Sequence, residues 1–158
     1  MEQALVKQTL LQEKYPVFIL EIEHEETSRR SVDEIADYFK EQIVAHKSAR
    51  FIAMFDHYAH TKSLPDGSVS EDILAAKNVI FCFGIALPDP QVLGLRPRSI
   101  GIAETAQGFV ITFLEAPMPI ANAAMEDWSK GLKDMPIRPA DLRQRGIEST
   151  NQRSTSIP

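Results

Sequence analysis

The most apolar stretch of the chain is VIFCFG at residues 79–84, which contains no charged or polar-uncharged side chain apart from the thiol of Cys82. A short run of aromatic and β-branched residues is typical of a strand that is buried on both faces. We therefore expect this strand to lie at the centre of a β-sheet that needs cover on both sides. Its position predicts that Cys82 is an unreactive core thiol, because burial in apolar surroundings disfavours the thiolate.

A helix is predicted immediately after the polar cluster at residues 24–30. Ser31 and Glu34 form the first and last positions of a capping box, which satisfies free N–H groups of a first helical turn. Apolar residues then recur at helical spacing and place one stripe toward a core. They are Val32, Ile35, Ala36, Phe39 and Ile43. The pattern predicts a helix over residues 31–46.

The remaining elements alternate between strands and helices. Strands are expected at residues 17–23, 51–58, 99–105 and 109–114, the last two forming a hairpin in which Gly108 supplies a positive φ. Both faces of the 51–58 segment are largely apolar, so we expect a central strand there as well. Helices are predicted at residues 2–14, 70–77 and 119–133. The fold class that follows is a two-layer α+β domain with a mixed, mainly antiparallel five-stranded sheet and two main helices.

The composition bounds the classes of function. The chain has 158 residues and a formal net charge of -5, which fits one globular domain over residues 1–135 and argues against general nucleic-acid binding. One cysteine excludes an intramolecular disulfide and fits the cytoplasm, and no apolar run approaches the roughly 20 residues of a membrane span. Residues 136–158 form a polar tail that we expect to be flexible or bound to a partner. Its arginines are Arg138, Arg143, Arg145 and Arg153.

The densest polar cluster in apolar surroundings follows the 51–58 strand. Asp56, His57 and His60 could join Glu104, from the fourth predicted strand, in general acid–base catalysis. A turn after the strand could also bring His57 and His60 together as ligands of a divalent metal. The alternative, which we favour, is that Asp56 and His57 bond to loop backbone and that Glu104 is solvated at the end of its hairpin.

A second candidate site is the sequence Arg96-Pro97-Arg98. Two guanidinium groups held by a rigid proline could clamp the carboxylate or phosphate of a small anionic ligand. The alternative is a pair of surface arginines in salt bridges with some of the many acidic residues.

Four sequence features carry a resemblance to a known family. They are F-x-x-x-F-D-H at residues 51–57, the Phe83-Gly84 strand end, Pro-Arg-Ser-Ile at 97–100, and Glu104 followed by Gln107-Gly108. Together they resemble the bacterial domain-of-unknown-function family numbered 302. The resemblance implies a two-layer α+β fold that is often dimeric, and it implies no established reaction.

We therefore expect a cytoplasmic, non-enzymatic ligand-binding or protein-interaction module that needs no cofactor. A homodimer is expected because the apolar strand faces exceed what two helical stripes can cover. The alternative function is a small enzyme or metal-binding protein that uses Asp56, His57, His60 and Glu104.

Overall fold

The computed structural model describes residues 5–136, which form six strands, three α-helices and two 3₁₀ helices. The strands are β1 (Lys7–Leu11), β2 (Tyr15–Glu23), β3 (Ala49–Asp56), β4 (Ala75–Phe83), β5 (Arg98–Glu104) and β6 (Gly108–Leu114). The helices are α1 (Val32–Ala45), α2 (His57–Ser63) and α3 (Pro119–Lys130), with 3₁₀ helices η1 (His24–Glu26) and η2 (Pro90–Leu95). The tail predicted for residues 136–158 lies outside the described residues, apart from Pro136.

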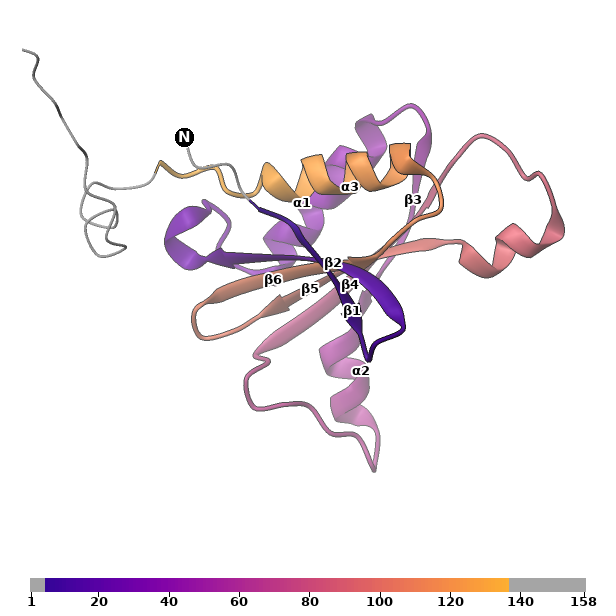
Figure 1. Ribbon diagram of the computed structural model, residues 1–158. Coiled ribbons are helices and arrows are strands. Elements are labelled where there is room, and N and C mark those ends of the chain that lie inside the picture. The colour runs from indigo at the N-terminus through magenta and orange to yellow at the C-terminus, as the bar shows by residue number, and fades with distance from the viewer. Residues whose placement is uncertain (1–4, 137–158) are drawn as a thin grey trace, which may run out of the picture.

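The strands form one sheet in the order β1-β2-β6-β5-β4-β3, and every neighbouring pair is antiparallel. Helix α1 connects β2 to β3, which forms the sheet edge opposite β1 (Figure 1). Strands β4, β5 and β6 then follow one another back across the sheet, so that β6 pairs with β2. The sequence therefore predicted one strand too few, and it wrongly predicted a mixed sheet where every pair is antiparallel. Strand β3 lies at an edge and β4 next to it, so neither is the central strand that the sequence predicts.

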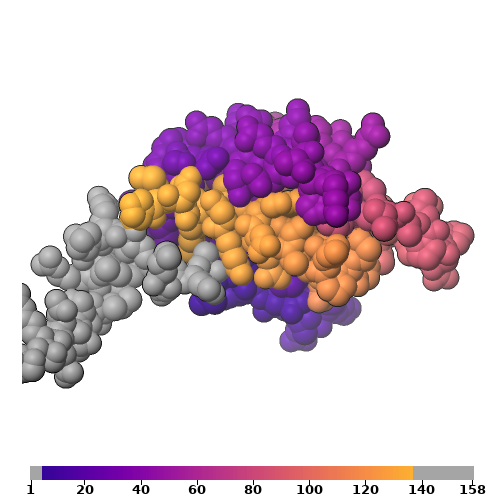
Figure 2. All heavy atoms as spheres, turned by 90° about the horizontal axis from the view of Figure 1, so that it is seen from above, coloured from indigo at the N-terminus to yellow at the C-terminus, as the bar shows by residue number. Residues whose placement is uncertain are grey.

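Helices α1 and α3 lie side by side on one face of the sheet (Figures 1 and 2). The inward stripe of α1 is buried as predicted, and its Ser31 accepts a hydrogen bond from the Glu34 backbone N–H at 3.1 Å. Alternate residues of the strands face these helices and complete the core. The largest buried side chains include Phe39, Phe81, Phe83, Phe109, Ile111 and Met125.

The opposite face of the sheet is half-buried and mostly apolar. No α-helix of residues 5–136 covers its middle, and α2 lies at one end of it (Figure 1). Strand alternation and register place there the apolar or small residues Val17, Ile19, Val110, Gly101, Ala103, Ala76, Ile80, Cys82, Ala53 and Phe55. The same register adds the polar residues Glu21, Thr112, Ser99, Asn78 and Arg50. The prediction of a core cysteine was wrong, because Phe81 and Phe83 face the helices and Cys82 faces away from them.

Three local predictions also differ from the structure. Residues 7–11 and 15–23 are strands, so the helix predicted at 2–14 is absent from its described part. The helix predicted at 70–77 is a turn that leads into β4, in which the Ser70 side chain accepts from the Asp72 N–H at 3.4 Å. Gly108 has no positive φ, and a Cβ there would lie 1.8 Å from the Ile22 carbonyl oxygen, so close approach requires the glycine.

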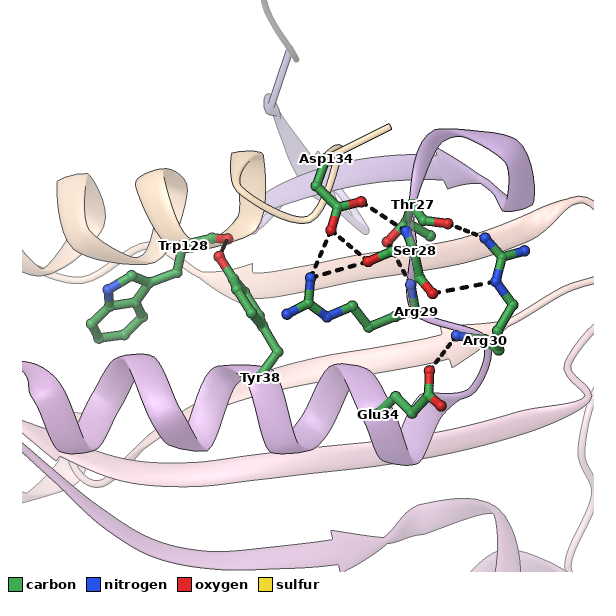
Figure 3. Close-up of polar contacts among 8 residues, drawn as sticks. All are labelled: Thr27, Ser28, Arg29, Arg30, Glu34, Tyr38, Trp128 and Asp134. Atoms are coloured by element: carbon green, nitrogen blue, oxygen red, sulfur yellow. Dashed lines mark hydrogen bonds and ion pairs between the residues drawn. The ribbon is translucent and has the colours of Figure 1, made fainter. Parts of the chain in front are cut away.

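A polar network ties the segment after α3 to the β2–α1 connection (Figure 3). Asp134 accepts hydrogen bonds from the Ser28 N–H at 2.7 Å and hydroxyl at 2.6 Å, and its carboxylate pairs with Arg29 at 2.7 Å. The Arg29 guanidinium lies 4.8 Å from the Tyr38 ring centre, and the Tyr38 hydroxyl donates to the Trp128 carbonyl at 2.6 Å. Burial acts to raise the pKa of Asp134, but the Ser28 bonds and the Arg29 charge outweigh it, so the pKa is lowered.

Within residues 5–136, no helix is long and apolar enough to cross a membrane.

Candidate functional site

The candidate site is a cavity of about 270 Å³ beneath the loop that joins β4 to β5. The loop contains η2 and projects past the N-terminal end of α3 (Figure 2). The cavity lies between the end of β4, this loop and the start of α3, and most of its lining is apolar. The lining residues are Phe83, Ile85, Ala86, Pro88, Val92, Leu95, Arg96, Arg98, Ala116, Pro117, Met118 and Ala121.

Arg98 is the buried cation of this site. Its residue exposure is 7%, because the alternation of β5 turns it to the same side as Ile100. One terminal nitrogen donates to the Leu95 carbonyl at 3.3 Å and the other donates to the Leu114 carbonyl. The Nε atom is buried and has no hydrogen-bond partner. Burial lowers the pKa of Arg98, since desolvation penalises the charged form.

No salt bridge within residues 5–136 involves Arg98 or Arg96. Arg96 is half-buried at the end of η2, where its Nη1 donates to the Ala86 carbonyl across the loop at 2.7 Å. Gly84 permits this arrangement, because its φ is +127° and a Cβ there would lie 3.2 Å from both the Arg96 Nη2 and the Met118 Cε. The structure thus brings the two predicted ligand-binding arginines to the same cavity.

The N-terminus of α3 adds a third source of positive potential. Met118 and Ala121 of its first turn line the cavity, and the 12-residue helix begins with neither a side-chain cap nor an acidic residue in that turn. Its first residue is a proline without an N–H, and the Ala121 and Asn122 N–H groups bond to the Met118 carbonyl, so its partial positive charge comes from the aligned peptide dipoles. The proline at position 119 predicts the start of this helix, but no sequence pattern links the helix end to the arginines, because the two meet only in the fold.

The residues predicted for catalysis or metal binding are distributed differently. Strand β3 ends at Asp56, whose carboxylate caps α2 by accepting from the Ala59 N–H at 2.8 Å. His57 bonds to the Asn78 side chain at 3.0 Å, on the sheet face away from α1 and α3. His60 lies one helical turn later, and its ring centre is 6.3 Å from that of His57.

Glu104 does not join this group. It is half-buried at the end of β5 on the helix-facing side, where its register partner on β4 is Ala75. Asp56 is on β3, two strands away or about 10 Å. The described part of the chain contains no group of three or more His, Cys, Asp or Glu residues placed to hold a metal ion. Glu104 and His57 therefore lie on opposite faces of the sheet, and the catalytic and metal-ligand roles of these residues stay predictions.

Comparison with known proteins places the chain in a family. No curated protein and no solved structure matches it. The resemblance to the family numbered 302 was wrong, because the model of a different family matches residues 6–134, which is most of the chain. On this match, the chain belongs to the Family of unknown function (DUF6858).

Proposed function

We propose that the protein is a non-enzymatic, cytoplasmic binding module that holds a small anionic ligand in the cavity beneath the 85–97 loop. The observation that carries this proposal is the buried guanidinium of Arg98, which lines the cavity and has no salt-bridge partner within residues 5–136. We prefer binding to the enzyme or metal-protein alternative because His57 and Glu104 lie on opposite faces of the sheet.

Burial of a charged group is costly unless the charge is paired. An ion removed from water without a counter-ion costs several kcal/mol, even when some of its donors find carbonyl groups. The Leu95 and Leu114 carbonyls satisfy part of Arg98 but leave its charge uncompensated. An anion in the cavity would supply that charge, and Arg96 would add a second donor from the loop.

Thermal shift measurements against a panel of inorganic and organic anions test the proposal. An anion that binds only the folded state, at one hundred times its Kd, raises Tm by about 5–10 °C. Arg98→Met should abolish this shift while leaving the ligand-free Tm unchanged or raised, because it removes a buried unpaired charge. Lys62→Met, an equal charge change at an exposed position of α2, is the matched control. Absence of any shift across the panel would refute the proposal.

We further propose that the module is a homodimer formed through the sheet face that lacks α1 and α3. Five strands spaced about 4.8 Å apart, with seven residues at about 3.4 Å each, span roughly 24 by 24 Å. Two such faces bury on the order of 1,200 Å², which reaches the lower end of the range for stable interfaces. The occupant that fits this area is a second copy of the chain.

Light scattering coupled to size exclusion tests the dimer. We expect twice 17.7 kDa at micromolar concentration for the natural chain, and 17.7 kDa for Ile80→Glu, which places a charge on the proposed interface. Val44→Glu, on an exposed position of α1, should remain dimeric. A monomer at every concentration tested would overturn the dimer without touching the ligand proposal.

A further inference from the structure

We infer that the ligand of the loop cavity is a small monocarboxylic acid with an apolar body of about eight carbon atoms. This inference rests on the proposed function, since it names the ligand class of the same site. Three properties of the cavity support it: the chemistry of its walls, its volume and the sign and location of nearby charge.

The walls favour an apolar ligand body. Ten of the twelve lining residues carry no ionisable or amide side chain, and the two others are the arginines. They offer aliphatic surface from Ile85, Val92 and Leu95, and an aromatic ring from Phe83. A sugar or nucleotide would leave its hydroxyl or amide groups unpaired against these walls, which is costly for a buried polar group.

The volume limits the size of the body. A cavity of about 270 Å³ is slightly smaller than the roughly 300–1,000 Å³ of sites for drug-sized molecules. At about 30 Å³ for a group the size of a water molecule, it holds about nine such groups. A carboxylate with seven or eight further carbons fills this space.

The charges favour a single anionic headgroup. Arg98, Arg96 and the α3 N-terminus are on the cavity side, and none of the lining residues is acidic. A planar carboxylate matches the fork geometry of a guanidinium, and two guanidinium groups line this cavity. Immediately outside, a shallower hollow of about 720 Å³ shares Leu95, Ala116 and Pro117 with the cavity and is lined by Glu115, Glu126 and Asp127. These carboxylates would repel a ligand with a second negative group that extended from the cavity into the hollow.

A chain-length series tests the inference on the full-length protein. Calorimetric titration with straight-chain carboxylates from butanoate to dodecanoate should show affinity rising about fourfold for each methylene group until the cavity is filled. We expect the rise to stop near octanoate. Octan-1-ol and octanamide, which have the same chain without the charge, should bind at least tenfold more weakly.

Variants separate the headgroup from the walls. Arg98→Met should reduce octanoate affinity at least tenfold and Arg96→Met should also weaken it, whereas the exposed control Lys62→Met should not. Circular dichroism of each ligand-free variant verifies folding. If Arg98→Met does not fold, Arg96→Met tests the contact with the headgroup in its place.

The outcomes distinguish the two proposals. If phosphate or citrate binds as tightly as octanoate, the monocarboxylate inference is wrong, but the proposal of an anion-binding site stands. If octan-1-ol binds as tightly as octanoate, the inference is also wrong, because the cavity then selects for the apolar chain and not for the charge. If no anion binds at all, the proposed function itself fails. Affinity that is independent of chain length would also overturn the inference, because it would place only the headgroup in the cavity.

Discussion

Replacement of Asp134 tests the polar network that attaches the segment after α3 to the body of the domain. Asp134→Ala removes two hydrogen bonds from Ser28 and the ion pair with Arg29. Hydrogen bonds to a charged group contribute about 1.5–3 kcal/mol each when buried, but the Asp134 side chain is 30% exposed and solvent screens it. We therefore expect a loss of about 2 kcal/mol in the free energy of unfolding.

For a domain of this size, 2 kcal/mol corresponds to a decrease of about 4–8 °C in Tm. Urea denaturation followed by circular dichroism measures the free energy directly. Asp66→Ala, in the exposed turn after α2, removes a carboxylate outside the network and is the matched control. A loss below about 0.5 kcal/mol in Asp134→Ala would show that the network does not hold this segment.

The pH dependence follows from the lowered pKa of Asp134. A carboxyl group whose folded pKa lies below its unfolded value of 3.8 stabilises the fold above pH 3.8. That contribution disappears as the pH falls through the folded pKa. Asp134→Asn should therefore be less stable than the natural chain at pH 7, and the difference should shrink below pH 3.8. An equal difference at pH 7 and pH 2.5 would contradict the assigned ionisation.

Three further predictions concern the fold. Ser31→Ala removes the N-cap bond of α1 and should cost about 1 kcal/mol in urea denaturation. Phe39→Ala leaves a cavity at a fully buried position of α1 and should cost about 3–5 kcal/mol, measured in the same way. Gly108→Ala forces a Cβ against the Ile22 carbonyl and should cost about 3 kcal/mol or more, so little folded protein should appear by circular dichroism. A Gly108→Ala protein as stable as the natural chain would mean that β2 and β6 can move apart locally.

Helix α1 could be predicted from the sequence because its determinants are local. Ser31 and Glu34 are three residues apart, and the apolar stripe from Val32 to Ile43 lies within the helix itself. The same local reasoning fails for β1. Its five residues are all exposed, and it forms a strand because it pairs with β2. Pairing also accounts for residues 75–77, which continue β4 between two neighbouring strands instead of forming a helix.

The candidate site was only partly accessible to sequence reasoning. Arg98 shares the alternation of Ile100 and Ile102, which turns it to the helix-facing side of its strand. Its burial depends on the 85–97 loop and on the residues that lead into α3, which are remote in sequence and carry no motif. For the cluster at Asp56, the sequence could not decide whether the strand continued. In the structure β3 ends at Asp56, α2 begins at His57, and His57 bonds to Asn78 on the face away from α1 and α3.

The pairing of β2 with β6 also determines when this protein can fold. Val17 pairs with Leu114, so one edge of β2 lacks its partner until nearly the whole domain has been synthesised. Because synthesis proceeds at about 5–20 residues per second, β2 stays unpaired with β6 for several seconds while the chain is on the ribosome. Contacts between segments so distant in sequence are slow to form, and a refolding time of milliseconds to seconds is expected. The nascent chain is therefore most exposed to aggregation before residue 114 emerges, and a truncation just before β6 should yield insoluble protein.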